Sequence, residues 1–250
     1  MAVVAVLDAE RIKLSTTRSP LWSTVAVAVL SLGVAMLQGS MVYGPGTLPP
    51  EKAAMGVAVF GVPVLMILSS LTVTNEYRSG LIRTTFTAVP SRSLVLVAKA
   101  VVAAVFSGIL ALLMVIASVV AAGLTAPAMA GLSLADGQTW RTAAAVGLYA
   151  ALAAVLGVGV GALVRASAGA VALLLLWPLV AEPMLGNLPR IGSEVGPYLP
   201  FANAFVFTRV QWLYPVYAMP WGEVGSMVYF AGVAAVVFVA ALVLINRRDA

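Results

Sequence analysis

The sequence contains no cysteine and no histidine, and only 9% of its residues are charged. Without those two residue types the chain cannot form a disulfide, use a thiolate or an imidazole in catalysis, or build the usual zinc ligand sets. The few acidic residues are scattered along the chain, so no metal site is predicted. No paired carboxylates or Ser-Lys pair occurs either, and therefore no catalytic residue is expected.

Apolar side chains are in excess instead. Of the 250 residues 62% are hydrophobic, and the mean hydropathy is +1.06. A soluble domain has roughly half apolar and a quarter charged residues, so the chain is predicted to be an integral membrane protein. The net charge of +5 does not indicate a nucleic-acid partner, because the basic residues flank apolar stretches rather than forming one patch rich in aromatics.

The charged residues divide the chain into apolar stretches that are long enough to cross a bilayer, which takes about 20 helical residues. One of these stretches, residues 166–189, is interrupted only by Glu182. The predicted spans lie near residues 21–41, 53–73, 97–124, 142–163, 168–188 and 225–245. The sequence therefore predicts an all-α membrane protein with six transmembrane helices, in one transmembrane domain that covers residues 1–250.

Lysine and arginine gather on one side of the predicted bilayer. If both termini share a side, that side receives Arg11, Lys13, Arg18, Arg78, Arg83, Arg92, Lys99, Arg165, Arg247 and Arg248, and the other side receives Lys52, Arg141, Arg190 and Arg209. Cytoplasmic loops carry the excess of basic residues, so both termini are predicted to be cytoplasmic in a multi-pass protein of the cell membrane. Asp8 and Glu10 precede the first long apolar run, which argues against a cleaved signal peptide.

The first residues of the chain have a weaker pattern. Val3, Leu7 and Leu14 fall at near-helical spacing, with charged residues turned elsewhere. Residues 3–17 are compatible with a short helix that lies along the inner membrane surface. A disordered tail is the alternative.

Residues 75–92, NEYRSGLIRTTFTAVPSR, hold four charged residues. On a single helix that starts at Asn75 and stops at Pro90, one stripe forms at about 100° per residue. The stripe consists of Glu76, Ser79, Gly80, Arg83 and Thr87. Two interpretations stay open: an amphipathic helix that fits a groove on another protein, or a surface helix whose arginines satisfy the positive-inside preference against lipid headgroups.

Residues 74–100 carry a resemblance to a known family. They fit the pattern E-Y-x-x-G-x-[IL]-R-T-x-x-x-x-x-P-x-R-x-x-x-x-x-A-K, which resembles the segment after the second span in permease subunits of ATP-binding cassette exporters of the second type, especially actinobacterial ones. Residues 9–22 (AERIKLSTTRSPLW), 160–180 and 198–205 (YLPFANAF) are also similar to segments of this family. The likeness covers almost the whole chain.

The resemblance implies that the loop after the second span is a coupling helix, which docks on a separate ATPase subunit. It places five residues at or near this contact: Glu76, Tyr77, Arg78, Gly80 and Arg83. It also implies an interfacial helix at the N-terminus, short helices that dip into the outer leaflet before the last span, and a second permease copy or paralogue. The implied function is ATP-driven export of an amphiphilic or hydrophobic substrate such as a drug, a peptide or a lipid.

The chain itself has no G-x-x-x-x-G-K-[ST] sequence, so nothing in it can hold nucleotide phosphates. ATP and Mg²⁺ are therefore expected on the partner ATPase, with no cofactor and no enzymatic activity in this chain alone. Two other functions stay open. One is a non-transporting membrane anchor or immunity protein that holds a cytosolic partner, and the other is a secondary transporter, which would need buried acids in several spans and repeat symmetry.

Two features inside the predicted spans suggest specific roles. Gly157 and Gly161 form a small-xxx-small pair, which permits close helix contact within the subunit or across a dimer axis. Glu182 lies about 21 Å along a helix that starts at Ala168, counting about 1.5 Å per residue. An acid at that depth could contact a cationic substrate in a translocation path, pair with Arg190 or Arg209, or mark the end of the span.

Residues 183–222 are dense in proline and aromatic residues. The uncharged stretches 195–208 and 210–222 are too short to span, and they are predicted to be re-entrant or interfacial. Five aromatic residues are expected at headgroup depth: Tyr198, Trp212, Tyr214, Tyr217 and Trp221. The segment is either a lid over the exit of a path or a belt that anchors the last span.

Overall fold

A computed structural model describes the chain except residues 1, 44–45, 128–129, 212–213, 216 and 248–250. The regular structure of the described part is helical, without a strand. Six of its helices are long and apolar enough to cross a membrane. The prediction of an all-α protein with six spans is therefore confirmed.

The spans are α2 (Arg18–Ser40), η1 with α4 (Val57–Gly61 and Val62–Ser79), α6 (Arg92–Thr125), α7 (Gly137–Val164), α8 with η2 and α9 (Ser167–Leu176, Trp177–Ala181 and Glu182–Gly186), and α12 (Gly222–Arg247). The shorter helices are α1 (Ala2–Thr16), α3 (Pro50–Ala53), α5 (Leu81–Ala88), α10 (Ile191–Val195), η3 (Gly196–Tyr198) and α11 (Pro200–Thr208). The helix α1 is separated from α2 by Thr17 in an extended conformation, so the N-terminal segment is a helix and not a disordered tail.

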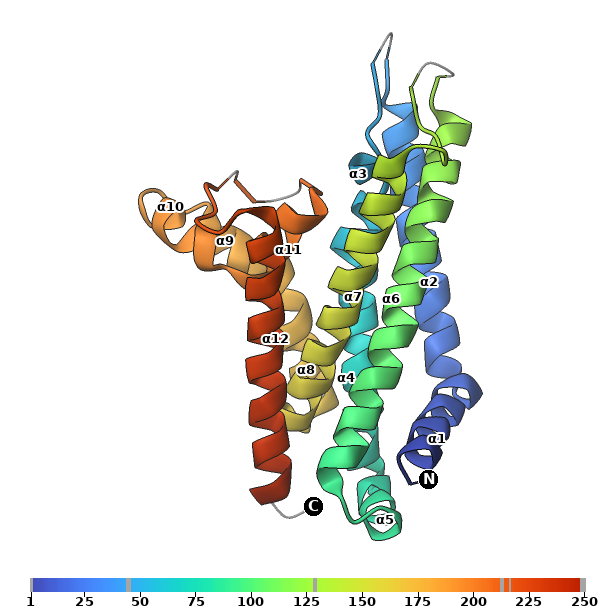
Figure 1. The fold of residues 1–250 in the computed structure, drawn as a ribbon, viewed down its shortest axis with the longest axis vertical. Helices are drawn as coiled ribbons and strands as arrows, with labels where there is room; N and C mark the ends of the chain where they lie inside the picture. Colours follow the sequence, from blue (N-terminus) through green and yellow to red (C-terminus); the bar gives the residue numbers. More distant parts are fainter. Residues whose placement is uncertain (1, 44–45, 128–129, 212–213, 216, 248–250) are drawn as a thin grey trace.

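The spans α4 and α7 form the centre of the bundle. Each is 72% buried along its apolar window, whereas the other four spans are 22–28% buried. The spans α2 and α6 pack on one side of this central pair and α8 and α12 on the other (Figure 1). The core between them contains Leu65 and Met66 of α4, Tyr149 of α7 and Phe230 of α12, so the apolar surface is buried around α4 and α7.

Both termini lie at the same end of the bundle, together with α1 and α5, while α3, α10 and α11 lie at the opposite end (Figure 1). This arrangement follows from the even number of spans. Arg248 lies outside the described residues. The other basic residues predicted to face the cytoplasm belong to α1, to α5 or to the parts of the spans that lie at the α5 end. The four remaining basic residues belong to the α3 end.

Several span boundaries differ from the prediction. The second span begins at Val57, because residues Pro50–Ala53 form the separate helix α3. The third span is longer than predicted: α6 begins at Arg92, where Ser91 caps it by accepting a hydrogen bond from the Leu94 amide. Its 34 residues measure about 51 Å at about 1.5 Å per residue, so α6 extends well beyond a hydrocarbon core of about 30 Å.

Two spans contain a π-helical turn beside a proline. Pro63 follows η1 and Pro178 lies within η2. Proline has no backbone N–H to donate, and a π turn is one of the ways in which a helix accommodates this break. The second and fifth spans therefore continue through the break instead of ending there.

The segment before the last span contains short helices up to Thr208, as predicted for residues 195–208, whereas the described residues of 209–221 form no helix. Residues Phe201, Ala204 and Phe205 of α11 are buried in the core beside Tyr149 and Phe230. Of the predicted interfacial aromatics, Tyr198 is exposed and Tyr214, Tyr217 and Trp221 are half-buried. Trp212 lies outside the described residues. The apolar face of α11 thus packs against α7 and α12 at the end of the bundle where α3 lies.

Candidate functional site

The segment predicted as one helix from Asn75 to Pro90 is two helices. The helix α4 runs through Ser79 and stops at Gly80, whose φ of 74° is left-handed, and α5 begins at Leu81. The prediction of a single helix is wrong because Gly80 adopts a conformation that residues with a Cβ rarely take, and such a residue commonly ends a helix. The chain thus changes direction at the end of the second span.

The helix α5 is anchored on one face and exposed on the other. Ile82 is buried, and Phe86 packs against a cluster that includes Val73 and Leu96. The guanidinium of Arg92 lies 5.3 Å from the centre of the Phe86 ring. The exposed side chains of α5 are Leu81, Arg83, Thr84, Thr87 and Ala88. The free face is therefore mostly polar, with one cation.

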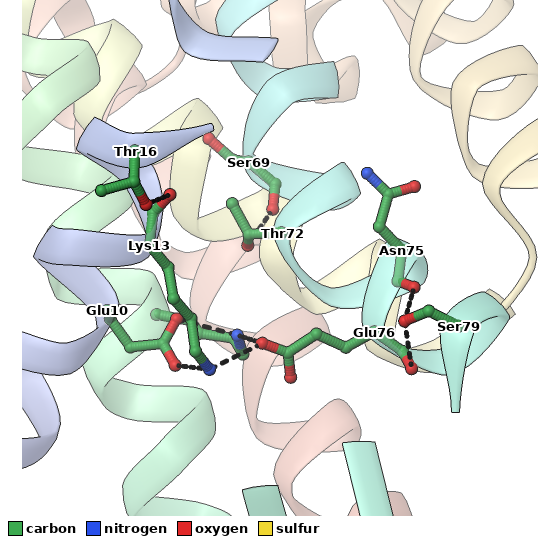
Figure 2. Close-up of polar contacts among 9 residues, drawn as sticks. Glu10, Lys13, Thr16, Ser69, Thr72, Asn75, Glu76 and Ser79 are labelled. Carbon is green, nitrogen blue, oxygen red and sulfur yellow. Dashed lines mark hydrogen bonds and ion pairs between the residues drawn. The ribbon is translucent and has the colours of Figure 1, made fainter. Parts of the chain in front are cut away.

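Four charged side chains join α1, α4 and α6. The Lys99 ammonium donates to Glu10 Oε2 at 2.8 Å and to Glu76 Oε1 at 2.7 Å. The Lys13 ammonium donates to Glu10 Oε1 and to Glu76 Oε1, both at 2.9 Å. Figure 2 shows Glu10 and Lys13 of α1 turned toward Glu76 of α4. We call this group, with no net charge, the ion cluster.

The members of the ion cluster differ in exposure. The Lys99 side chain is only 2% exposed, whereas the Lys13 side chain is 45% exposed. Burial alone lowers the pKa of Lys13, but the hydrogen bonds to Glu76 and Glu10 outweigh it and raise this pKa above its ordinary value. Lys13 is therefore charged at neutral pH. Since every charge has a partner of opposite sign, the large cost of burying an unpaired ion is avoided.

Two of the residues that the resemblance placed at the partner contact are covered by neighbouring helices of the bundle. Glu76 is 8% exposed and is turned toward α1 and α6, not outward. Tyr77 is half-buried, with the Arg165 guanidinium 4.8 Å from its ring centre. Both lie on the last turns of α4, which continues the buried span. Arg78, Gly80 and Arg83 are exposed, so these three are available to a partner.

Sequence reasoning did not find Glu10, Lys13 and Lys99 as one group. The separations between them along the chain reach 89 residues. The sequence did contain a signal that Lys99 has a partner. Lys99 stands in a long apolar run, and a single cation buried in such a run needs a carboxylate beside it. Which carboxylate it meets depends on how α1 packs against α6, and local spacing does not reveal that packing.

A cavity of about 810 Å³ lies beside the ion cluster. Its walls come from α1, the first turn of α2, α4, α5 and α6. Apolar side chains such as Val6, Leu71 and Val102 line it together with the four members of the ion cluster and Arg78. The cavity thus combines an apolar interior with charged groups.

Glu182 has a different environment, at the opposite end of the molecule. Its carboxylate is completely buried and accepts hydrogen bonds from Trp177 Nε1 at 2.8 Å and from the amides of Phe201 at 3.0 Å and Ala202 at 3.2 Å. These amides form the N-terminus of α11, which favours a negative charge. The sequence left pairing with Arg190 or Arg209 open as one alternative; among the described residues Glu182 forms no ion pair with either, and Arg209 bonds Glu223 at 2.9 and 3.0 Å. A role in a substrate path stays a prediction.

The two glycines of α7 lie directly against α4. A Cβ at Gly157 would collide with the carbonyl oxygen of Met66, and one at Gly161 would come 2.7 Å from the carbonyl oxygen of Ser70. The sequence allowed a contact within the subunit or one across a dimer axis, and these two glycines make the contact within the subunit. The absence of side chains at these positions lets the backbones of α4 and α7 approach closely.

No model of a known protein family matches the chain, and a search among curated proteins found no match. Within the described part of the chain, no three acidic side chains cluster closely enough to hold a metal ion. Function is therefore inferred from the geometry of the α5 end and from the sequence pattern.

Proposed function

We propose that this chain is the permease subunit of an ATP-driven exporter in the cell membrane, with the α5 end in the cytoplasm. In this proposal α5 docks on a separate ATPase subunit, which binds ATP and Mg²⁺. The distribution of basic residues supports the orientation, because most of them belong to the α5 end.

The observation that carries the proposal is the way α5 is connected to the spans. It lies outside the bundle, one residue beyond α4, and presents an exposed polar face. A force applied to α5 reaches α4 through Gly80, and it reaches α1 and α6 through the ion cluster. Such contiguous packed contacts are what a coupling element needs in order to transmit a movement from a soluble partner to membrane helices.

We further propose that two permeases, identical or paralogous, assemble with two ATPases and move an amphiphilic or hydrophobic substrate between them. The exposed faces of α2, α8 and α12 are apolar, with residues such as Val29, Leu176 and Val236 on the surface. These faces suit contact with lipid and with a second permease. Six helices rarely enclose a wide path alone, and therefore the path is placed between two subunits.

The first test is purification of the tagged protein from its own host in mild detergent. An ATPase with a phosphate-binding loop is expected to copurify in equal amount. Charge reversal of Arg83, Arg83→Glu, should reduce the recovered ATPase because Arg83 is exposed on the free face of α5. The matched control is Arg190→Glu, an exposed arginine at the opposite end, which should leave the ATPase bound.

An ATPase-free homo-oligomer at several salt concentrations would contradict the proposal and favour a membrane anchor or a secondary transporter. Equal loss of the ATPase in both variants would show that α5 is not the contact. Glu76 is unsuited to this test, because its reversal would disrupt the ion cluster before it affected a surface.

A further inference from the structure

The cavity beside the ion cluster has the size of a ligand site. Its volume of about 810 Å³ lies within the range of roughly 300–1,000 Å³ that is usual for small-molecule pockets. It is bordered by α1 and by the ends of α4 and α6 that lie at the α5 end (Figure 1). In the proposed orientation this is the level of the inner leaflet, where lipid headgroups meet the cytoplasm.

The walls of the cavity favour a hydrocarbon chain. Leu68 and Leu71 of α4 and Val95 and Val102 of α6 line the interior, and Val6 contributes from α1. Water would have few hydrogen-bonding partners along these side chains, whereas an acyl chain removes their apolar surface from water. The chemistry of this part matches the tail of an amphiphile.

The charged lining favours a negatively charged headgroup. The cavity is lined by the cations Lys13, Arg78 and Lys99 and by the anions Glu10 and Glu76, which leaves one positive charge in excess. Arg78 is exposed, and among the described residues its side chain has no hydrogen bond or ion pair. Lys13 uses two of its three ammonium protons in the ion cluster.

We infer that this cavity is a binding site for an anionic phospholipid of the inner leaflet. One acyl chain occupies the apolar interior, and the phosphate accepts hydrogen bonds from the Arg78 guanidinium and the free Lys13 proton. Basic pockets between membrane helices on the cytoplasmic side bind lipid headgroups in this way. The site goes beyond the proposed transport function, since it requires neither the ATPase nor a particular substrate.

The test measures lipid retention on the full-length protein by native mass spectrometry from detergent. Phosphatidylglycerol and phosphatidylcholine with identical acyl chains are compared. Phosphatidylglycerol should bind more tightly, and Arg78→Gln should weaken its binding about fivefold, the effect of roughly one basic residue near an anionic lipid. The matched control is Arg11→Gln, an exposed arginine of α1 that does not line the cavity, and this variant should bind as the unmodified protein does.

A second variant tests the position of the acyl chain. Thr72→Phe places a ring in the cavity from α4 and should lower retention of phosphatidylglycerol, while size-exclusion chromatography checks that the protein stays folded. Unchanged retention in Thr72→Phe would overturn the placement of the chain. Equal binding of both lipids, or equal loss in the Arg78 and Arg11 variants, would overturn the headgroup site. Displacement of phosphatidylglycerol by equimolar glycerol 3-phosphate would show a free-phosphate site instead.

Discussion

Replacement of Lys99 by methionine isolates the contribution of the ion cluster. Methionine keeps an apolar side chain of similar length but removes the ammonium that donates to both Glu10 and Glu76. The cluster then carries one uncompensated negative charge in a buried place. Breaking a buried ion pair by removing one partner costs roughly 3–5 kcal/mol. Lys13→Met also leaves one negative charge in excess, but the ammonium that it removes is half-exposed, so water can take its place at the carboxylates and the cost should be at most about 1 kcal/mol.

The assay uses the absence of cysteine from the chain. A single cysteine at Val6, which is buried on α1 and lines the cavity, reacts with a polyethylene-glycol maleimide too large to enter that cavity only when α1 separates from the bundle. At about 1.4 kcal/mol per tenfold change, Lys99→Met should accelerate labelling at least about 100-fold if its cost is expressed as detachment of α1. Lys13→Met should accelerate labelling by about fivefold or less.

Equal acceleration of labelling by the two substitutions would refute the reasoning. It would mean that the burial of the ammonium does not determine the free-energy cost of removing it. Unchanged labelling in Lys99→Met would mean that the cluster does not hold α1. A triple variant, Lys99→Met with Glu10→Gln and Glu76→Gln, supplies a control for charge. It leaves no buried charge without a partner, so its labelling should return most of the way toward the slow rate.

Four further outcomes are expected. Gly157→Ala should lower the unfolding free energy by roughly 1–3 kcal/mol, because the added Cβ makes α7 collide with α4. Gly33→Ala has no atom near its added Cβ and should not lower the unfolding free energy. Thermal unfolding in detergent compares the two variants. Glu182→Gln should destabilise the protein by about 1–2 kcal/mol, because an amide nitrogen would replace one of the two oxygens that accept from the N–H groups of Trp177, Phe201 and Ala202, and a wild-type melting curve would contradict this. Gly80→Ala should reduce copurification of the proposed ATPase, since a left-handed residue with a Cβ costs about 1 kcal/mol and α5 shifts to relieve it. The pKa of Lys13 is raised in the folded protein. The stabilising effect of Lys13 is therefore fully present below its ordinary pKa and is lost only as the pH rises through the higher pKa of the folded state. The difference in melting temperature between wild type and Lys13→Met should thus be constant from about pH 7 to 9.

The sequence was sufficient for the number and approximate limits of the spans, because hydropathy and charge placement are local properties. It was less informative at helix ends. The extension of α6 to Arg92 depends on a cap from Ser91, and the separation of α4 from α5 depends on the backbone of Gly80. A helical projection of residues 75–90 ignores that break, and therefore it placed Glu76 on a surface stripe with Arg83.

Contacts between distant segments were beyond the reach of local patterns. The partners of Lys99 come from α1 and α4, and the partners of Glu182 are backbone amides of α11. A backbone donor carries no sequence signal, so a search for charged partners led to Arg190 and Arg209. The small-xxx-small pair at Gly157 and Gly161 was visible, but the sequence could not tell a contact within the subunit from one between subunits.

The backbone contact between α4 and α7 has a mechanical consequence. Where Gly157 and Gly161 meet the carbonyls of Met66 and Ser70, α7 contributes no side chain that could change rotamer and absorb a displacement. The pair is therefore expected to move as a single rigid body. Any opening or closing of the subunit is then expected at contacts outside this pair.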